Sequence, residues 1–493
     1  MNRLKKTVFL IAVICGLLLS ASGQDAAVRI IQTTDLHGTI DHGRLARVAT
    51  LVERETRDAG GKENSLRIDC GDLVQGSYAM TFPAGREFMI RFLNRLSFDV
   101  FIPGNHDFEF GSAALLPLLG QFRGTVLASN LEWTGAPVRP WKMFRRSGLN
   151  IAVIGIAYPS LDRMFVPPVL DPVRVLSVKK QLETVIPEVM SARPDLILLA
   201  VHAGEQTRFE PDFSCYDLVR RYPQIDLVLC GHSHQTDPGK ALGKSTWRIQ
   251  GPALANGIAV AEISFDRKKR RVTSLKTRLA MIQDAPEHPE IKNQVKSLDR
   301  QAFRSGRQPV AEIPSELRPP ERNEYSSFLT KVCGRAIMKA TKAEIVFYGV
   351  SSRFRVQRGV LNRFQLFRLL PYADHILTVD LTADEVIRIL QEQIAIRQKK
   401  GMYQTPSGLH FTLAGRKVRS VALDPSGQPL ENGRTYRTAF SSYIFAGSGR
   451  SPILHSIVKN KEAVYFPAQV REMVADYLTE TCPIQKKQQR GTP

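Results

Sequence analysis

The chain has 493 residues, which is too long for one compact core and indicates two domains joined by a linker. Its hydrophobic content of 43% and charged content of 23% are ordinary for a globular protein and exclude a fibrous or disordered chain. The formal net charge of +21 favours anionic partners of any kind, although a solvated basic surface is the commoner explanation. No nucleic-acid recognition motif accompanies the charge.

The N-terminus has the three parts of a secretory signal peptide. A basic start is followed by an apolar run at residues 8–19 and by small residues at 20–23. The run is short for a bilayer span, so we predict cleavage near Gly23 and a periplasmic or secreted protein with no membrane span after cleavage. The alternative is a retained membrane anchor.

The first half of the chain alternates apolar runs with amphipathic segments. Short β-rich runs bounded by Gly, Asp or Pro predict strands at 28–33, 65–69, 150–157, 196–201 and 227–230. Helical periodicity predicts helices at 45–58, 86–96 and 178–191. Two further strands, at 258–265 and 271–282, are expected to close the domain in antiparallel fashion. This alternation is typical of an α/β layered domain, here spanning 28–282.

A proline-rich and charged stretch at 283–320 predicts an interdomain linker that holds one helix at 291–304. A second α/β domain is expected at 321–478, followed by a tail at 479–493.

Polar residues cluster where the predicted strands of the first domain end. The carboxyl ends of strands at one edge of an α/β sheet converge on a crevice where ligands usually bind. Five of the ten histidines fall at such positions. The residues are Asp35 and His37 in TTDLHG, Asp72 in CGD, Asn105 and His106 in PGNHD, His202 in VHAG, and His232 and His234 in GHSH.

The carboxylates, imidazoles and amide of this set suit two borderline divalent ions such as Mn, Zn, Co or Fe. One candidate site takes Asp35, His37 and His234, and Asp72 bridges it to the next. The second site takes Asn105, His202 and His232.

The cysteines show no C-x-x-C spacing, which argues against a thiolate metal site. Cys70 and Cys230 each end an apolar strand, and we interpret them as buried residues rather than a redox pair. Disulfide connectivity is left open.

The order and wording of these motifs resemble the calcineurin-like metallophosphoesterase superfamily. More narrowly, they resemble the 5′-nucleotidase family, which includes periplasmic bacterial enzymes and 2′,3′-cyclic phosphodiesterases. The segment at 71–111, GDLVQGSYAMTFPAGREFMIRFLNRLSFDVFIPGNHDFEFG, is similar nearly end to end. The resemblance implies a catalytic domain of two β-sheets flanked by helices, plus a smaller C-terminal α/β domain that binds substrate. It also implies two divalent metal ions and attack by a metal-bound hydroxide on phosphorus.

His106 resembles the family's catalytic histidine, which stabilises the transition state or the leaving group. The acidic residue three positions later orients that imidazole, and this chain has Glu109 where the family usually has Asp.

The C-terminal half departs from the family's substrate motifs. The substrate arginine aligns with Arg353, and one ring of the aromatic clamp aligns with Tyr403. The residues before Arg353 lack the expected Asn and paired glycines, and the run at 447–451 lacks the second aromatic. Arg355 and Arg450 are therefore expected either to meet a more anionic substrate or to be solvated.

These observations predict an exported dinuclear-metal phosphohydrolase that removes phosphate from nucleotides. One alternative is a phosphodiesterase or a hydrolase of cyclic nucleotides, nucleotide sugars or non-nucleotide phosphoesters. An alternative of another class makes the C-terminal part a degenerate binding module for an anionic partner.

Overall fold

The computed structural model describes residues 25–204, 214–243, 245–321, 324–399, 403–449 and 451–484. The predicted signal peptide, Arg450 and most of the predicted tail lie outside these residues. Within them, no helix has the length and apolar character that crossing a bilayer requires.

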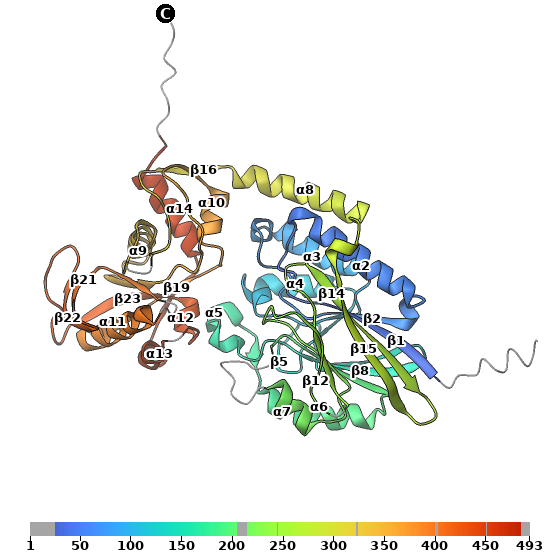
Figure 1. Ribbon diagram of the computed structural model, residues 1–493. Helices are drawn as coiled ribbons and strands as arrows, with labels where there is room; N and C mark the ends of the chain where they lie inside the picture. The colour runs from blue at the N-terminus through green and yellow to red at the C-terminus, as the bar shows by residue number, and fades with distance from the viewer. Residues whose placement is uncertain are drawn as a thin grey trace, which may run out of the picture.

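The first domain contains two β-sheets packed face to face (Figure 1). The larger sheet has the order β15-β14-β1-β2-β3-β4-β6. Its strands from β1 to β6 pair in parallel, and β14 and β15 add antiparallel neighbours at one edge, as the sequence predicted. The bounds are β1 Asp25–Thr33, β2 Ser65–Asp69, β3 Val100–Phe101, β4 Thr125–Leu127, β6 Val138–Arg139, β14 Gly257–Asp266 and β15 Arg271–Met281.

The smaller sheet of the first domain has the order β12-β13-β11-β10-β8-β7. Its four inner strands are parallel, and the two outer strands are antiparallel to their neighbours. The bounds are β7 Trp141–Arg146, β8 Leu149–Ile156, β10 Leu196–Val201, β11 Leu227–Leu229, β12 Asp237–Ala241 and β13 Trp247–Gln250. All five strands predicted before residue 231 are confirmed to within a few residues.

The core between the sheets follows the two-residue period of the strands. Val28 and Ile30 of β1 face the other sheet and pack with Val153 and Leu198, whereas Ile31 faces the outer helices. The larger sheet is covered by α2 Arg44–Asp58, α3 Pro83–Arg95 and α4 Ser112–Gln121, and the smaller by α6 Val178–Ser191 and α7 Cys215–Arg221.

Helix α6 shows why these helices form where the sequence predicts them. Ser177 caps its first turn by accepting a hydrogen bond from the amide of Lys180. Leu182, Ile186 and Val189 then recur at helical spacing and are buried against the smaller sheet. Each such side chain contributes about 1.5–3 kcal/mol on burial.

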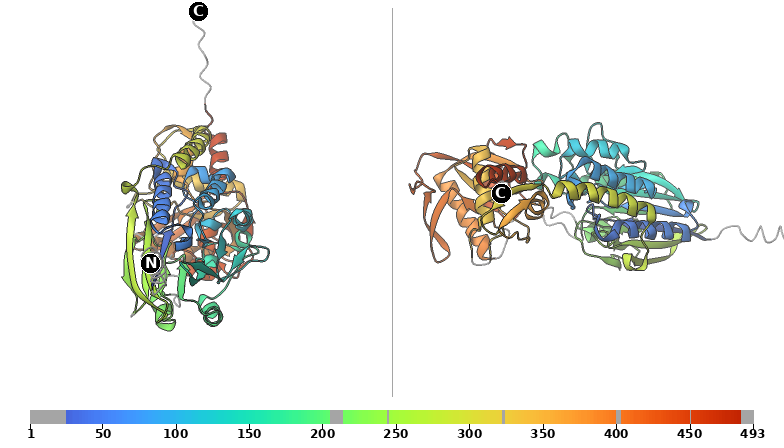
Figure 2. Two further views of the ribbon diagram at one scale, coloured as in Figure 1. Left: turned by 90° about the vertical axis from the view of Figure 1, so that its right-hand side faces the viewer. Right: turned by 90° about the horizontal axis from the view of Figure 1, so that it is seen from above.

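The predicted linker is structured and is divided between the two domains. Helix α8 Pro289–Gly306 starts with proline at its first position and buries Ile291, Val295 and Ala302 against the first domain. The next strand, β16 Pro309–Ile313, pairs antiparallel with β18 Gly359–Asn362 of the second domain. Helix α8 runs along the outside of the first domain towards the second (Figures 1 and 2). Pro289 therefore begins a helix and Pro309 begins a strand within the predicted linker.

The second domain is built on a five-stranded sheet of order β20-β17-β23-β19-β24. The strands are β17 Ile345–Tyr348, β19 Ile376–Thr382, β20 Thr405–Ser407, β23 Thr435–Ser441 and β24 Val464–Phe466, with a separate hairpin of β21 Leu409–Ala414 and β22 Lys417–Leu423. Alternate residues of β17 enter two cores, one on each face. The helices are α9 Phe328–Thr341, α10 Arg363–Leu369, α11 Ala383–Gln398, α12 Ser442–Phe445, α13 Pro452–Val458 and α14 Val470–Thr481. The last helix extends three residues past 478, the predicted end of the domain.

The two domains touch beside the strand ends of the first domain. Helix α5 Pro167–Leu170 projects towards the second domain (Figure 1), and Val169 packs there against Leu377. The hydroxyl of Ser448 donates to the carbonyl oxygen of Arg163 at 2.5 Å. These contacts set the second domain against the edge where the predicted metal ligands lie.

Candidate metal centre and active site

The structure brings all seven predicted metal ligands together at one end of the two-sheet sandwich. Each ligand lies just beyond the carboxyl end of a strand. Asp35 and His37 follow β1, Asp72 follows β2, Asn105 follows β3, His202 follows β10, and His232 and His234 follow β11. The strand-end argument therefore places the side chains correctly, although their role as ligands stays a prediction.

Five of these seven residues have left-handed backbone conformations, with φ between 50° and 67°. The five are Asp35, His37, Asp72, His232 and His234. Such conformations cost non-glycine residues about 1–3 kcal/mol each and persist only where surrounding contacts enforce them. The amide of His37, for example, donates to the carbonyl oxygen of Asp72 at 2.8 Å. These left-handed conformations turn alternate residues of one loop towards a single point, which an extended strand would not do.

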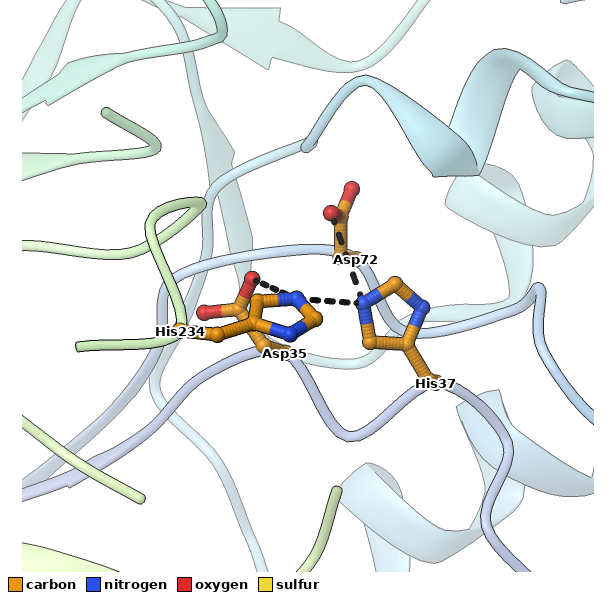
Figure 3. Close-up of side chains that lie close together, drawn as sticks. All are labelled: Asp35, His37, Asp72 and His234. Carbon is orange, nitrogen blue, oxygen red and sulfur yellow. Dashed lines mark hydrogen bonds and ion pairs between the residues drawn. The ribbon is translucent and has the colours of Figure 1, made fainter. Parts of the chain in front are cut away.

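One cluster of ligand atoms comprises Asp35, His37, Asp72 and His234, whose donor atoms all lie within 4.8 Å of one another. The Nε2 atoms of His37 and His234 face each other at 3.0 Å (Figure 3). The Oδ1 atom of Asp35 lies 3.3 Å from Nε2 of His234, and Oδ2 of Asp72 lies 3.7 Å from Nε2 of His37.

A second cluster comprises Asp72, His202 and His232, with the amide of Asn105 beside it. Nε2 of His202 lies 3.2 Å from both Oδ2 of Asp72 and Oδ1 of Asn105. Nδ1 of His232 lies 2.8 Å from the same Asn105 oxygen. Asp72 thus belongs to both clusters, in the bridging place that the sequence predicted for it.

The ring orientation of two histidines is fixed by backbone carbonyl groups. Nδ1 of His37 lies 3.0 Å from the carbonyl oxygen of Gln75, and Nδ1 of His202 lies 2.5 Å from that of Cys70. Because a carbonyl oxygen only accepts hydrogen bonds, both Nδ1 atoms carry a proton. Each ring therefore turns Nε2 towards the cluster. Metal-binding histidines are typically held in this way.

The field of the buried carboxylates favours positive charge in the centre. Burial disfavours the charged form of His202, but the carboxylate of Asp72 outweighs it and raises the pKa of His202 to about 10. Burial opposes ionisation of Asp72 itself, yet His202 and His106 hold its pKa well below the usual range. At His232 the effect of burial dominates: it lowers the pKa of the imidazole to about 4, so the ring is neutral at pH 7.

The donor set fits two divalent ions. It consists of imidazole nitrogens, carboxylate oxygens and one amide oxygen, which suit Mn, Fe, Co or Zn. Asp35, Asp72 and His202 are almost fully buried, and buried charges of this kind are expected to be paired or to hold a metal. The Nδ2 atom of Asn105 is buried with no hydrogen-bond partner among the described residues, whereas its Oδ1 atom points into the second cluster.

Asp107 is a residue that the sequence analysis missed. Its carboxylate accepts hydrogen bonds from the amides of Asp72, Leu73, Val74 and Gly104 at 2.7–3.1 Å. It therefore holds the loop that carries the bridging carboxylate. The signal was available in the final Asp of PGNHD, but three of its four partners lie more than thirty residues away in the chain.

His106 and Glu109 lie beside the two clusters and outside both. Nδ1 of His106 is 3.0 Å from Oε2 of Glu109, so the glutamate reaches the imidazole in spite of its extra methylene. Burial opposes the charged imidazole, but the carboxylates of Asp72 and Glu109 raise the pKa of His106 to about 9. The amide of His106 also donates to Oδ1 of Asp72 at 2.7 Å.

A cavity of about 180 Å³ lies next to His106, between the two domains. Beside His106 and Glu109, the first domain contributes Met164, Phe165 and Val169 to the lining. The residues that the second domain contributes include Tyr372, Asp374, Gln404 and Tyr443. None of the described residues that line the cavity is a lysine or an arginine.

The structure does not bring the two predicted substrate residues into this lining. Tyr403 is only 7% exposed and packs in the core of the second domain with Tyr325 and Arg397. Arg353 is an exposed residue of the loop after β17 and is absent from the cavity wall. Arg355 pairs with Glu321 at 3.1 Å on the surface. The sequence motifs identified loops that do contribute to the cavity wall, through Ser351 and Gln404. They did not identify which side chains of these loops face the cavity.

The cysteines near the centre are buried free thiols, as the sequence analysis interpreted Cys70 and Cys230. Burial raises the pKa of the Cys70 thiol, so it stays protonated and takes no part as a thiolate.

Two family models match the chain. Residues 28–236 match the calcineurin-like phosphoesterase family, and residues 310–456 match the 5′-nucleotidase C-terminal domain. A 5′-nucleotidase of Vibrio cholerae serotype O1 is 21% identical over 532 residues, covering 96% of this chain and 95% of that protein.

A relative of a different size is the endonuclease YhcR of Bacillus subtilis. It is 20% identical over 470 residues, and the match covers 87% of this chain but only 38% of the endonuclease, so this chain spans well under half of that protein. A solved structure of a candidate 5′-nucleotidase from Staphylococcus aureus, in complex with alpha-ketoglutarate, superposes with a TM-score of 0.77. It is 17% identical and covers 92% of this chain and 97% of its own, which establishes the same fold.

The two matched domains and the paired Asp and His clusters agree with each other. The chain combines a calcineurin-like phosphoesterase domain, a type that uses two divalent metal ions, with a 5′-nucleotidase C-terminal domain, and its homologues are metal-dependent phosphoric ester hydrolases.

Proposed function

We propose that this protein is an exported 5′-nucleotidase-like enzyme that removes phosphate from nucleotides at a centre of two divalent metal ions. The observation that carries the proposal is the carboxylate of Asp72, which is shared by two ligand clusters and faces a histidine in each. A shared carboxylate holds two ions close together, as two-metal hydrolysis of phosphoesters requires.

Each ligand has a proposed place. Asp35, His37 and His234 hold the first ion, Asn105, His202 and His232 hold the second, and Asp72 bridges them. Bound ions of this kind would act as Lewis acids on phosphate oxygens and would lower the pKa of a water ligand to about 7. The protein's part is to fix the ring orientations through Gln75 and Cys70, and to exclude water by burial.

His106 is proposed to act on the substrate's phosphate or on its leaving oxygen. Its Nδ1 atom is engaged by Glu109, so Nε2 is the atom left to face the substrate. With a pKa of about 9 the imidazole keeps its proton at pH 7. Nε2 can therefore donate a hydrogen bond to the negative charge that develops in the transition state, and the proton can follow to the leaving oxygen.

The leaving group is proposed to occupy the cavity between the domains. Its described lining holds the aromatic rings of Phe165, Tyr372 and Tyr443 and has no lysine or arginine, which suits an uncharged, ring-containing group such as a nucleoside. Because the second domain forms much of this wall, a substrate role for it is favoured over a separate binding module. The relative from Vibrio cholerae is named a 5′-nucleotidase, which supports the same assignment.

Export is proposed from the three-part N-terminal pattern at residues 1–23, with the mature chain in the periplasm or the medium. Detection of a mature N-terminus near residue 24 in the periplasmic or culture fraction would test it. Recovery of the full-length chain with the membranes would favour the anchor instead.

The test of the proposed activity is Asp72→Asn. The variant keeps the size of the side chain but removes the charge that both clusters share, so hydrolysis of 5′-AMP should fall at least 1000-fold while the circular-dichroism spectrum stays unchanged. Asp58→Asn, at the exposed end of α2, is the matched control and should keep wild-type activity. Wild-type turnover by Asp72→Asn would refute the proposed centre.

A second candidate substrate class follows from the altered pocket. Tyr403 is buried, and the run at 447–451 lacks an aromatic residue, so a two-ring clamp of the expected kind does not form. Cyclic nucleotides, nucleotide sugars and non-nucleotide esters are therefore alternatives. A substrate panel with Mn, Co, Zn or Mg returned to metal-stripped protein separates them by kcat/KM.

A further inference from the structure

A short loop of the second domain, residues 371–375 between α10 and β19, reaches across the domain boundary to the catalytic histidine. We infer that this loop is a positioning element for His106, and that it acts through the backbone amide of Ala373 and the carboxylate of Glu109. The inference rests on the proposed function, because it assigns the loop to the machinery of the same reaction.

The carboxylate of Glu109 is held at both oxygens. Oε2 accepts from Nδ1 of His106 at 3.0 Å, and Oε1 accepts from the amide of Ala373 at 2.7 Å. Glu109 is only 7% exposed, so water competes little for either oxygen. A carboxylate fixed at both ends cannot rotate freely, and it passes a fixed direction on to the imidazole ring. Oε2 therefore orients His106, and Oε1 links the pair of His106 and Glu109 to the second domain.

The neighbouring residue makes a second contact with the same imidazole. The ring of Tyr372 lies with its centroid 5.9 Å from that of His106 and is tilted by only 20°. Two adjacent residues of one loop thus restrict the orientation of the imidazole. Ala373 acts through Glu109, the partner of Nδ1, and Tyr372 acts on the face of the ring.

The loop itself is held firmly by the second domain. At its start, Nη1 of Arg471 donates to the carbonyl oxygen of Leu370 at 2.7 Å. Near its end, Asp374 accepts from the amide of Val470 at 2.8 Å and from the hydroxyl of Tyr348 at 3.0 Å. The donor that meets Glu109 is therefore placed in advance, and a preorganised donor loses little entropy when it is used.

The length of the glutamate matters for this bridge. An aspartate at position 109 is shorter by one carbon–carbon bond of about 1.5 Å. It could approach His106 or Ala373 but could not span both as Glu109 does. The bridge also gives the second domain a direct effect on the chemistry, because moving that domain away would release one end of Glu109.

Ala373→Pro tests the bridge, since proline has no amide hydrogen to donate. With p-nitrophenyl phosphate as a small substrate, kcat should fall about 10- to 100-fold, the range expected for a misplaced catalytic group, while KM changes less than threefold. Ala373→Gly is the conservative variant, keeps the amide hydrogen and should recover most of the lost kcat. A purely structural role would lower only the fraction of folded enzyme, so kcat per folded molecule would stay at the wild-type value.

Glu109→Asp provides the second arm. It should lower kcat by a similar factor, and adding Ala373→Pro to it should cause no further loss, because the bridge is already broken. A wild-type kcat in Glu109→Asp overturns the inference, even where Ala373→Pro fails to fold. The inference is also overturned if the losses of kcat in the two single variants multiply in the double variant. Failure of the proposed function looks different, because Asp72→Asn would then remain active.

Discussion

The Nε2 atom of His202 lies 3.2 Å from the Oδ2 atom of Asp72, and both side chains are almost fully buried. A buried carboxylate and imidazole at this distance stabilise each other, which is why the pKa of His202 rises to about 10 against the effect of burial. A divalent ion held by Asp72 and His202 would take the place of the proton on Nε2 of His202. Metal affinity should accordingly grow with pH.

Removing His202 should empty one of the two proposed metal positions. His202→Ala is expected to bind about one equivalent of Mn or Zn per chain where the wild type binds two, because the other cluster keeps its four donors. Metal content after dialysis, measured by mass spectrometry, checks this. His410→Ala, which changes an exposed histidine on β21, should retain the wild-type content. Two tightly bound equivalents in His202→Ala would contradict the assignment.

Gly104 is required by space rather than by backbone conformation. A Cβ atom there would collide with Oδ1 and the amide of Asp72 and would lie 2.7 Å from Cε1 of His202. Gly104→Ala should therefore displace the bridging carboxylate and lower kcat/KM at least 100-fold. Gly120→Ala is the matched control, since a Cβ atom on this exposed turn of α4 meets nothing within 4 Å. Equal activity of the two variants would show that the centre is more pliable than the structure implies.

Tyr443 lines the cavity proposed for the leaving group. Tyr443→Ala should raise KM for a nucleoside monophosphate about tenfold, because loss of a base–aromatic contact costs roughly 1–3 kcal/mol. KM for a small aliphatic phosphate monoester should not change. Parallel measurements on Tyr403→Phe and Arg353→Ala decide whether the two substrate residues predicted from the sequence contact the substrate at all.

Asp226 gives the first domain a stability that depends on pH. Its carboxyl accepts the amide of Ile197 at 2.8 Å, and burial raises its pKa from 3.8 to about 6. The folded protein thus holds this proton more tightly than the unfolded chain. The contribution is complete below pH 3.8 and is lost as pH rises through about 6, by an amount on the order of 3 kcal/mol.

Asp226→Asn keeps an acceptor for Ile197 but cannot ionise. Urea denaturation should give similar midpoints for the variant and the wild type near pH 4, and a higher midpoint for the variant at pH 7. A difference between the two proteins that does not change with pH would exclude Asp226 as the titrating group.

Much of the catalytic domain was predictable because its signals are local. Strand β2 at 65–69 and helix α6 at 178–191 follow directly from runs of apolar residues with the period of two or of 3.6. The helix predicted inside the linker, at 291–304, is present as α8, but only the packing of Ile291 and Val295 shows that this helix lies against the first domain.

The amino-acid sequence by itself determined the α/β class of the chain, the main strands of the catalytic domain and the residues that meet at its strand ends. Those features depend on patterns within short stretches and on the rule that parallel strands present their carboxyl ends together. The tertiary structure alone decided that Asp107 holds the bridging loop, that Tyr403 is buried, and that Ala373 donates to Glu109. These are contacts between segments far apart in the chain, and no local periodicity encodes which side chain of a loop turns inward.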